Sequence, residues 1–567
     1  MINFVPSQIN LLIHFWSRFC FSVAYGYSFI QLFVLFFMLE ILSSDLHSRI
    51  TFFEVNNKKI LTPTLVPVVD PRDNIITPHE MKHTFGFNFL ITSSYLYLKR
   101  YGMPNVHSPP IHQTLDFDGI VMMDSGAYQI LAYGDVSISP LQSLELQSLV
   151  QTDIGVILDV PTPPSDSFDE AKNKMEQTIE RIELSLDHVK THDKTLWTLP
   201  IQGGKNVSLI DNYIQKVKEK NYLDYFSFYA LGSVVPIMAS YDYTTLFSMI
   251  HHARSNLPYH IPLHIFGAGH PMIFPFIVAL GGDTFDSAAY ILFAKDNRYM
   301  TSTGTLILDN IQEFPCDCEV CSKYTPQELR ESPHNERIRA LAAHNLHISS
   351  TEIKLIREAI RNGNLWELLE QRALSHPNLY QAFHVLTDLS KKGFFDIGTP
   401  ITKSGGLKIY NHLSFDRPEF KIIRERILKN YQKNSESLYI YLLSGEKTPI
   451  ELFNLNPELK DKLINHLSSA DVSLFLPFFG VFPFELHETY PFSQFVFSNV
   501  IDSIILEKAI EVTINYIMKK GYSEIIILPA ERKEKLNSIR DKLQDKLQML
   551  DKVELNVYTS KEKSEED

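Results

Sequence analysis

The chain has 567 residues, enough for several domains, and its 44% hydrophobic and 21% charged residues exclude collagen-like, fibrous and disordered proteins. Its 53 Lys and Arg residues against 66 Asp and Glu residues give a formal net charge of −13, which excludes a generally basic nucleic-acid binder and leaves only a local basic face for such contacts. The four cysteines exclude a disulfide-stapled scaffold.

The amino-terminal segment differs from the rest of the chain. Residues 19–39 carry no charge and are long enough to span a bilayer, and Arg18 on their amino side is typical of a signal anchor. Alternatively, translation begins at Met38, which opens an ordinary cytosolic start. We expect residues 1–37 to be an apolar extension outside the fold, and we favour a cytoplasmic location over a membrane anchor through residues 19–39.

Eight short apolar runs follow, most ending in polar, Gly or Pro residues, with helical patterns between several of them. They are LTPTLVPVVD (61–70), FGFNFLITSS (85–94), GIVMMDSGAY (119–128), GVILDVPTPP (155–164), LWTLPIQGG (196–204), YFSFYALGSV (225–234), PLHIFGAGHP (262–271) and FPFIVALGGDTFDS (274–287). Strands buried on both faces and alternating with helices predict an α/β fold, a (β/α)8 TIM barrel, over residues 38–385. A doubly wound open sheet is the alternative, but no GxGxxG follows the first run.

Polar residues are expected at the carboxyl ends of these strands, where TIM barrels carry their chemistry. They are Asp124, Ser125, Asp159, Gln202, Ser233, His270, Asp283 and Asp286. We call the open end of the barrel at the carboxyl ends of its strands the mouth. Carboxylates and amides directed into this mouth indicate recognition of a planar, hydrogen-bonding substrate combined with acid/base chemistry. A single strand-end Asp often only caps the next helix, so the inference depends on several of them converging.

Three of the four cysteines lie within six positions, in the pattern C-x-C-x2-C formed by Cys316, Cys318 and Cys321. His344 follows Cys321 after 22 intervening residues, and His347 is a rival for the fourth ligand. Three thiolates and one imidazole form a closed tetrahedral set, which predicts one structural Zn2+ rather than a catalytic one. A redox cluster is the weaker alternative, because no thioredoxin-like context surrounds the cysteines. We therefore expect a zinc-binding subdomain, with its site at residues 316–344, inserted into the barrel domain.

The pattern changes after the barrel. We expect one accessory domain at residues 386–470, with a helix in RPEFKIIRERILKNYQ and a strand in LYIYLLS, and a second, α+β accessory domain at residues 471–558. The second contains a helix from Ser503 to Lys519, a strand in EIIILPA and a charged helix after it. The charged tail at residues 559–567 is expected to be disordered.

Seven motifs in fixed order resemble those of a known family. They are DSGAYQ, LDVPTPP, IQGG, ALGSVVP, FGAGHP, GGDTFDSAAY and the cysteine cluster with its histidine. This set resembles the tRNA-guanine transglycosylases, most closely their archaeal branch, which inserts 7-cyano-7-deazaguanine on the way to archaeosine. The resemblance runs from Met38 to residue 385 and more loosely into the accessory domains. The family's first strand lies close to the start of its chains, which favours Met38 as the initiator.

The resemblance implies roles for the strand-end residues. Asp286 would attack C1′ of the nucleotide and form a covalent tRNA intermediate, and Asp124 would move protons to and from the bases, although the family's two aspartates have been described both ways round. Asp159 would accept the N1–H and 2-amino donors of the base. The remaining substrate-binding residues would be Ser125, Tyr128, Gln202, Gly232 and Ser233. The family often has Gly-Gly where this chain has Gly232-Ser233, and a serine there would alter the pocket for the 7-substituent.

The resemblance also implies the partners: tRNA with a target guanine at position 15 of the D-arm, guanine and 7-cyano-7-deazaguanine, and a second copy in a homodimer. Two basic stretches are candidates for RNA contact, although such stretches more often form a solvated helix face: Arg337, Arg339, Lys354, Arg357 and Arg361, then Arg417, Lys421, Arg424, Arg426 and Lys429. Archaeal relatives add a terminal PUA RNA-binding module that we do not expect in this chain, so a separate PUA-domain protein is a further expected partner. The alternative functions are a queuine-type exchange at the anticodon and a non-catalytic tRNA-binding paralogue.

Overall fold

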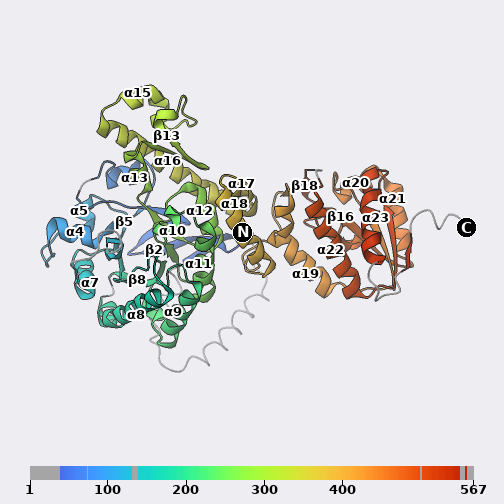
Figure 1. Ribbon diagram of the computed structural model, residues 1–567, viewed down its shortest axis with the longest axis horizontal. Coiled ribbons are helices and arrows are strands. Elements are labelled where there is room, and N and C mark those ends of the chain that lie inside the picture. Colours follow the sequence, from blue (N-terminus) through green and yellow to red (C-terminus); the bar gives the residue numbers. More distant parts are fainter. Residues whose placement is uncertain are drawn as a thin grey trace, which may run out of the picture.

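The computed structural model describes residues 39–548, without residues 73, 130–137, 193 and 499–500, together with a short strand at 556–558. The described chain forms two lobes along its long axis (Figure 1). Helices α17 (Leu365–Ala373) and α18 (Pro377–Lys391) lie between them. The apolar segment at 19–39 and the tail at 559–567 fall outside the described residues, apart from Leu39. Among the described helices, none has the length and apolar character needed to cross a membrane.

The first lobe is built on an eight-stranded parallel sheet in the order β4-β11-β10-β9-β8-β7-β6-β5. Its strands are β4 (Thr64–Pro67), β5 (Phe89–Ser93), β6 (Ile120–Asp124), β7 (Ile154–Val156), β8 (Leu196–Ile201), β9 (Phe228–Leu231), β10 (Leu263–Ile265) and β11 (Thr284–Ser287). A parallel bridge between Val68 and Ile91 joins the two ends of this order, so the sheet closes nearly completely. The predicted TIM barrel is confirmed.

The eighth predicted strand is shorter than expected. Within the run 274–287, Phe274–Ala279 forms helix α12, and β11 begins only at Thr284. Pro275 occupies the first turn of this helix, where its missing N–H costs nothing. A short apolar run does not distinguish a buried helix from a buried strand by periodicity, which explains the error.

A three-stranded antiparallel sheet, not predicted from the sequence, precedes the barrel. It consists of β1 (Leu39–Asp45), β2 (Ser48–Val55) and β3 (Lys58–Thr62). Asn56 and Asn57 form the two-residue turn between β2 and β3, both with positive φ, as the preferred hairpin turn requires. Side chains of this sheet pack in one cluster with inward residues of the barrel strands: Phe53, Val55 and Ile60 with Val66, Phe89, Ile91, Ile120, Met122, Ile154, Val156 and Phe228. The sheet therefore closes the amino end of the barrel and leaves chemistry to the opposite end.

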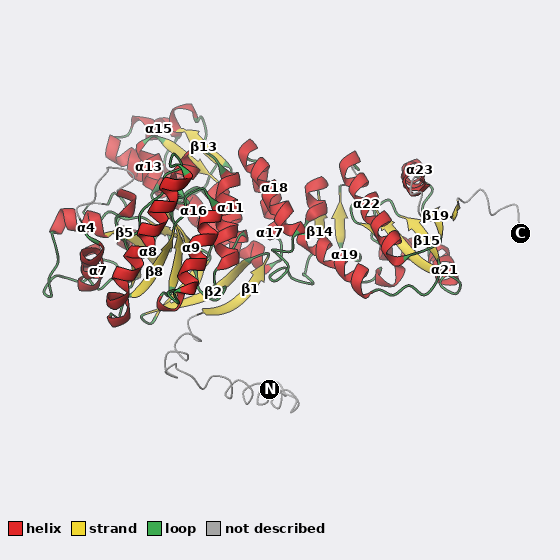
Figure 2. Ribbon diagram, turned by 60° about the horizontal axis from the view of Figure 1, so that its bottom comes forward, coloured by secondary structure: helices red, strands yellow, loops and turns green. Residues whose placement is uncertain are grey.

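Helices cover the outside of the barrel (Figure 2). They are α3 (Pro78–His83), α4 (Ser94–Tyr101), α5 (Ile111–Leu115), α7 (Pro140–Leu149), α8 (Phe168–Thr191), α9 (Val207–Glu219), α10 (Val235–Ala239), α11 (Tyr243–Asn256) and α13 (Ala289–Lys295). In α8, Ser167 and Glu170 form a capping box, and Ala171, Met175 and Ile179 repeat every four residues on the buried face. This helix confirms the helical pattern seen in the sequence.

A small subdomain follows β11. The hairpin of β12 (Arg298–Thr301) and β13 (Gly304–Ile307) leads into α14 (Glu319–Lys323) and α15 (Pro326–Glu331). The long helix α16 (His334–Arg361) then returns along the barrel and packs on α13. Figure 1 shows this subdomain at the edge of the barrel lobe, away from the second lobe.

The second lobe contains a mostly parallel five-stranded sheet whose strands come from both expected accessory domains. Its order is β17-β16-β15-β19-β20, where β15 (Ser437–Leu442) lies between β16 (Asp471–Leu476) and β19 (Glu524–Pro529). One hydrophobic cluster extends from Leu407 to Leu547. The boundary expected between residues 470 and 471 therefore falls inside one sheet, and the boundary expected after residue 385 falls inside α18. The cause is non-local pairing, which local sequence patterns do not report.

Three helices of this lobe lie where helices were predicted: α19 (Pro418–Asn430), α22 (Ser503–Lys520) and α23 (Glu534–Gln548). The other elements are β14 (Leu407–Ile409), α20 (Pro449–Leu455), α21 (Pro457–His466), β17 (Gly480–Pro483), β18 (Phe495–Phe497) and β20 (Asn556–Tyr558). Strands β14 and β18 pair with each other as a separate two-stranded sheet.

Candidate active site and metal centre

Three carboxylates converge at the carboxyl ends of the barrel strands. Asp124 is the last residue of β6, Asp159 follows β7, and Asp286 lies in β11. Burial, together with the nearby charges of Asp159 and Asp286, raises the pKa of Asp124 to about 7, against hydrogen bonds from the backbone at Gly126 and Ser125 that lower it. The charges of Asp159 and Asp286 contribute to this pKa because like charges repel across short distances, which agrees with the three carboxyl groups lying at the same end of the barrel.

The Asp286 carboxylate is held by two partners. The backbone N–H of Gly267 donates to Oδ1 at 2.7 Å, and Nε2 of His264 lies 3.2 Å from the same oxygen. The other ring nitrogen of His264 lies 2.8 Å from Oγ1 of Thr284. His264 was missed from the sequence, although a histidine inside an otherwise apolar strand was a signal for a buried polar contact.

A chain of hydrogen bonds connects Asp159 to the next two strands. The side-chain amide of Gln202 donates to Asp159 Oδ2, Ser233 Oγ donates to Gln202 Oε1 at 2.8 Å, and the backbone N–H of Thr162 donates to Ser233 Oγ at 3.0 Å. Burial raises the pKa of Asp159 to about 6, opposed mainly by the hydrogen bond from Gln202. An ideal Cβ on Gly232 would lie only 2.3 Å from Gln202 Nε2. The site therefore needs glycine at position 232 for the amide to reach the carboxylate.

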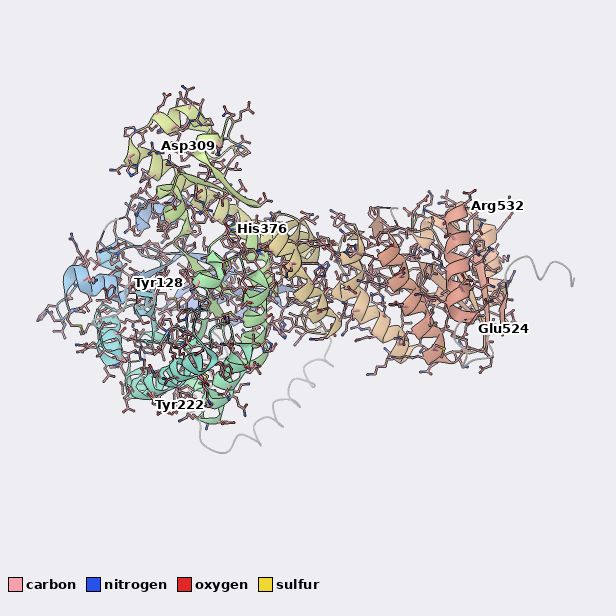
Figure 3. The ribbon with its side chains drawn as sticks, in the orientation of Figure 1. Tyr128, Tyr222, Asp309, His376, Glu524 and Arg532 are labelled. Atoms are coloured by element: carbon pink, nitrogen blue, oxygen red, sulfur yellow. The ribbon has the colours of Figure 1, made fainter. Side chains whose placement is uncertain are left out.

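The other predicted residues divide into those at the mouth and those elsewhere. Tyr128 is 48% exposed on the barrel lobe (Figure 3), and Ser125 is buried with no hydrogen-bond partner for its hydroxyl among the described residues. Asp283, in contrast, precedes β11 and binds Arg49 at 2.8 Å, so it lies at the amino end of that strand. His270 caps a short 3-10 helix through Met272 N–H. Asp283 and His270 thus have structural partners, and the expectation that both belong to the mouth was wrong for Asp283.

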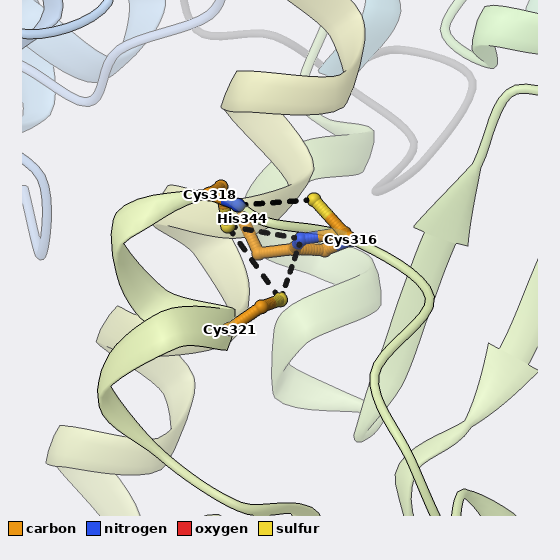
Figure 4. Close-up of side chains that lie close together, drawn as sticks. All are labelled: Cys316, Cys318, Cys321 and His344. Atoms are coloured by element: carbon orange, nitrogen blue, oxygen red, sulfur yellow. Dashed lines mark hydrogen bonds between the residues drawn. The ribbon is translucent and has the colours of Figure 1, made fainter.

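The four predicted metal ligands come together in the subdomain after β11 (Figure 4). The ligand atoms of Cys316, Cys318, Cys321 and His344 all lie within 4.8 Å of one another. The sulfurs of Cys318 and Cys321 are 3.6 Å apart, and each lies 3.5 Å from Nδ1 of His344. Sulfur ligands about 2.3 Å from a tetrahedral ion lie about 3.8 Å from each other, so this spacing fits one metal ion.

His344, rather than His347, completes the cluster. The Nε2 atom of His344 lies 2.9 Å from the backbone oxygen of Met300, which fixes the ring with Nδ1 toward the sulfurs. The ring of Tyr299 stacks on His344 at 3.6 Å between centroids, and the Tyr299 hydroxyl lies 3.3 Å from Cys321 Sγ. His347 is exposed on the same helix. The rivalry between the two histidines is thereby resolved in favour of His344.

Most of the candidate RNA-binding residues have structural partners. Arg417 is fully buried, with ion pairs to Glu367 at 3.1 Å and Glu419 at 2.7 Å. Residues that donate to backbone oxygens or pair with carboxylates in the same way are Arg337, Arg339, Arg357, Arg361, Lys421 and Arg424. Those that are exposed without a described ion pair are Lys354, Arg426 and Lys429. The two stretches therefore stabilise the fold more than they form a basic face.

A parallel barrel with converging carboxylates at the carboxyl ends of its strands has the form of a barrel enzyme. The family model described as queuine tRNA-ribosyltransferase matches residues 45–378. The chain belongs to this family of pentosyl-transferring glycosyltransferases.

Relatives named tRNA-guanine(15) transglycosylase match most of the chain. The protein from Sulfolobus acidocaldarius is 34% identical over 505 residues, which cover 88% of this chain and 97% of the relative. The one from Saccharolobus solfataricus is 35% identical over 87% of this chain and 97% of its own length. The one from Thermococcus onnurineus is 37% identical over 81% of this chain and 71% of its own length.

Proposed function

We propose that this chain exchanges guanine 15 of tRNA for 7-cyano-7-deazaguanine, a step of archaeosine biosynthesis, through a covalent aspartyl-tRNA intermediate. The observation that carries the proposal is the pair of aspartates with different environments. Asp286 is bound by two partners in an ordered position, whereas Asp124 has a pKa raised to about 7. A nucleophile and a proton-exchanging acid are the two roles that base exchange on a ribose needs. The environments favour Asp286 as the nucleophile and Asp124 as the acid/base.

In the proposed reaction, a carboxylate oxygen of Asp286 attacks C1′ as the bond from C1′ to the guanine nitrogen breaks. The electron pair of that bond leaves with guanine, and the proton of Asp124 neutralises the departing base. The incoming base then gives its N9 proton to the Asp124 carboxylate and attacks C1′, which releases Asp286. Two displacements retain the configuration at C1′, as in retaining glycosidases.

Base recognition follows from the hydrogen-bond chain of Asp159, Gln202 and Ser233. Guanine and 7-cyano-7-deazaguanine share an N1–H and a 2-amino group, two parallel donors for the Asp159 carboxylate. Since Ser233 donates to Gln202 Oε1, the amide is oriented with its N–H donors free to meet O6 as well as Asp159. The Ser233 hydroxyl is already engaged by Gln202 and Thr162, so in this proposal it orients the amide. Tyr128 would stack on the purine face.

The metal is proposed to be Zn2+ in a structural role. The thiolates of Cys316, Cys318 and Cys321 and Nδ1 of His344 would hold it, and their donor types and spacing fit zinc with no open position. A bound zinc would supply folding energy to the subdomain, and no chemical step passes through it. We further propose that the protein forms a homodimer and that it acts on tRNA in the cytoplasm.

The test is incorporation of radiolabelled guanine or 7-cyano-7-deazaguanine into unmodified tRNA by the purified protein, beside Asp286→Asn and Asp124→Asn. Incorporation by the wild type and none by either variant supports the proposal, and mapping the label distinguishes position 15 from the anticodon exchange of a queuine-type enzyme. If the wild type binds tRNA and zinc but remains inert, alone and with a separate PUA-domain protein, the chain is a non-catalytic tRNA-binding paralogue.

A further inference from the structure

His264 lies on the barrel strand next to the one that carries Asp286. It is opposite Thr284 in the pairing of β10 and β11, and Thr284 and Asp286 share one face of β11 because side chains alternate along a strand. The His264 side chain is 0% exposed, and each of its ring nitrogens faces one of these two residues, at 2.8 Å and 3.2 Å. A buried histidine with both nitrogens engaged is fixed in its rotation as well as its position.

The two oxygens of Asp286 have different surroundings. Oδ1 lies 2.7 Å from the Gly267 nitrogen and 3.2 Å from His264 Nε2. No hydrogen bond to Oδ2 is found among the described residues, and the side chain is 13% exposed. Two partners hold the carboxylate by Oδ1 and leave Oδ2 without a hydrogen bond among the described residues.

From this geometry we propose that His264 is a positioning residue for Asp286 and that Oδ2 is the oxygen that attacks C1′. This inference rests on the proposed base exchange. It adds that Oδ2 of Asp286 is the attacking atom and that His264 orients the carboxylate. An ionised carboxylate only accepts hydrogen bonds, so Nε2 of His264 carries a proton when it binds Oδ1. With Nε2 as the donor to Asp286, Nδ1 accepts from the Thr284 hydroxyl, and the two contacts together align the Asp286 carboxylate.

Matched variants separate positioning from mere packing. His264→Gln keeps a donor at the reach of Nε2, whereas His264→Leu keeps the approximate volume and removes the donor. Thr284→Val keeps the shape of threonine and removes only the hydroxyl that holds the ring. His188→Leu is the control, because His188 is a partly buried histidine on α8 that contacts Ser148 outside the mouth.

The measurements are kcat and KM for the labelled base, the rate of the covalent tRNA adduct on a denaturing gel, and the thermal unfolding midpoint. A misaligned nucleophile costs up to about 100-fold in rate, so His264→Leu is expected to lower kcat and adduct formation about 10- to 100-fold, with KM for the base within about 2-fold. His264→Gln is expected to recover most of this rate, and Thr284→Val to lose less than His264→Leu.

Wild-type kcat in a folded His264→Leu, or equal losses in His264→Gln and His264→Leu, overturns the positioning role. If His264→Leu does not fold, Thr284→Val decides, and a wild-type kcat in this folded variant overturns the positioning role as well. An inert wild type overturns the proposed function itself, and with it the reaction that His264 would serve, so the two failures are distinguishable.

Discussion

Gly232→Ala is the substitution for which the structure gives the clearest magnitude. The added Cβ would lie 2.3 Å from Nε2 and 3.1 Å from Cδ of Gln202. Ordinary contact begins at about 3.5 Å, so the amide must retreat by about 1 Å and leave Asp159. Losing a hydrogen bond to a charged group costs about 1.5–3 kcal/mol. That converts to a fall of about 10- to 150-fold in kcat/KM for the base.

Stability is expected to change little, because the displaced group is the flexible end of a side chain rather than backbone. The assay is steady-state incorporation of labelled base into tRNA, with thermal unfolding measured in parallel. Gly304→Ala is the matched control, since a Cβ there meets nothing within 4 Å. A kcat/KM for the base that stays at the wild-type value in Gly232→Ala would refute the reasoning, as would an equal loss in Gly304→Ala.

Three other predictions concern the acid role of Asp124, the metal cluster and the buried ion pairs of Arg417. Because the raised pKa of about 7 keeps Asp124 protonated at lower pH, the single-turnover rate of guanine release is expected to fall as the pH rises through about 7. Cys318→Ala removes one thiolate ligand, so metal content measured by mass spectrometry is expected to be lost together with several degrees of the unfolding midpoint. Arg417→Met leaves two buried glutamates without their partner, and urea unfolding is expected to show a loss of about 3–5 kcal/mol, against about 0.5 kcal/mol or less for the exposed Arg426→Ala.

Each of these expectations has a contradicting result. A rate that stays constant between about pH 6 and about pH 9 would remove Asp124 from the acid role. Full metal content in Cys318→Ala, or an equal loss in the exposed His347→Ala, would place the ion elsewhere. A free energy of unfolding that falls equally in Arg417→Met and Arg426→Ala would show that the buried ion pairs do not stabilise the fold.

Features set by short stretches of sequence were predictable. The eight strands and the C-x-C-x2-C cluster depend on local patterns, and the structure contains all of them. The metal cluster was accessible because cysteine is rare in this chain, so its clustering has few explanations. The confirmed barrel then placed Asp124, Asp159 and Asp286 at one end, since parallel strands present their carboxyl ends together.

Features set by pairing across the chain were not predictable. The second lobe was divided at residue 470 because nothing local shows that β15 pairs with both β16 and β19. His264 was overlooked because its partners follow it by about 20 residues, on another strand. Arg417 was a candidate for RNA contact because a run of charged residues gives the same pattern whether the side chains are solvated, bound to RNA or buried against glutamates.

Closure of the barrel has a consequence for its synthesis. Strand β4 pairs with β11, which the ribosome makes about 220 residues later. At about 5–20 residues per second, the ribosome completes β11 about 10–45 s after β4. Asp286 and Thr284 both arrive with that final strand. The ribosome therefore makes the residues of the hydrogen-bond chain from Asp159 to Ser233 before it makes Asp286, the proposed nucleophile.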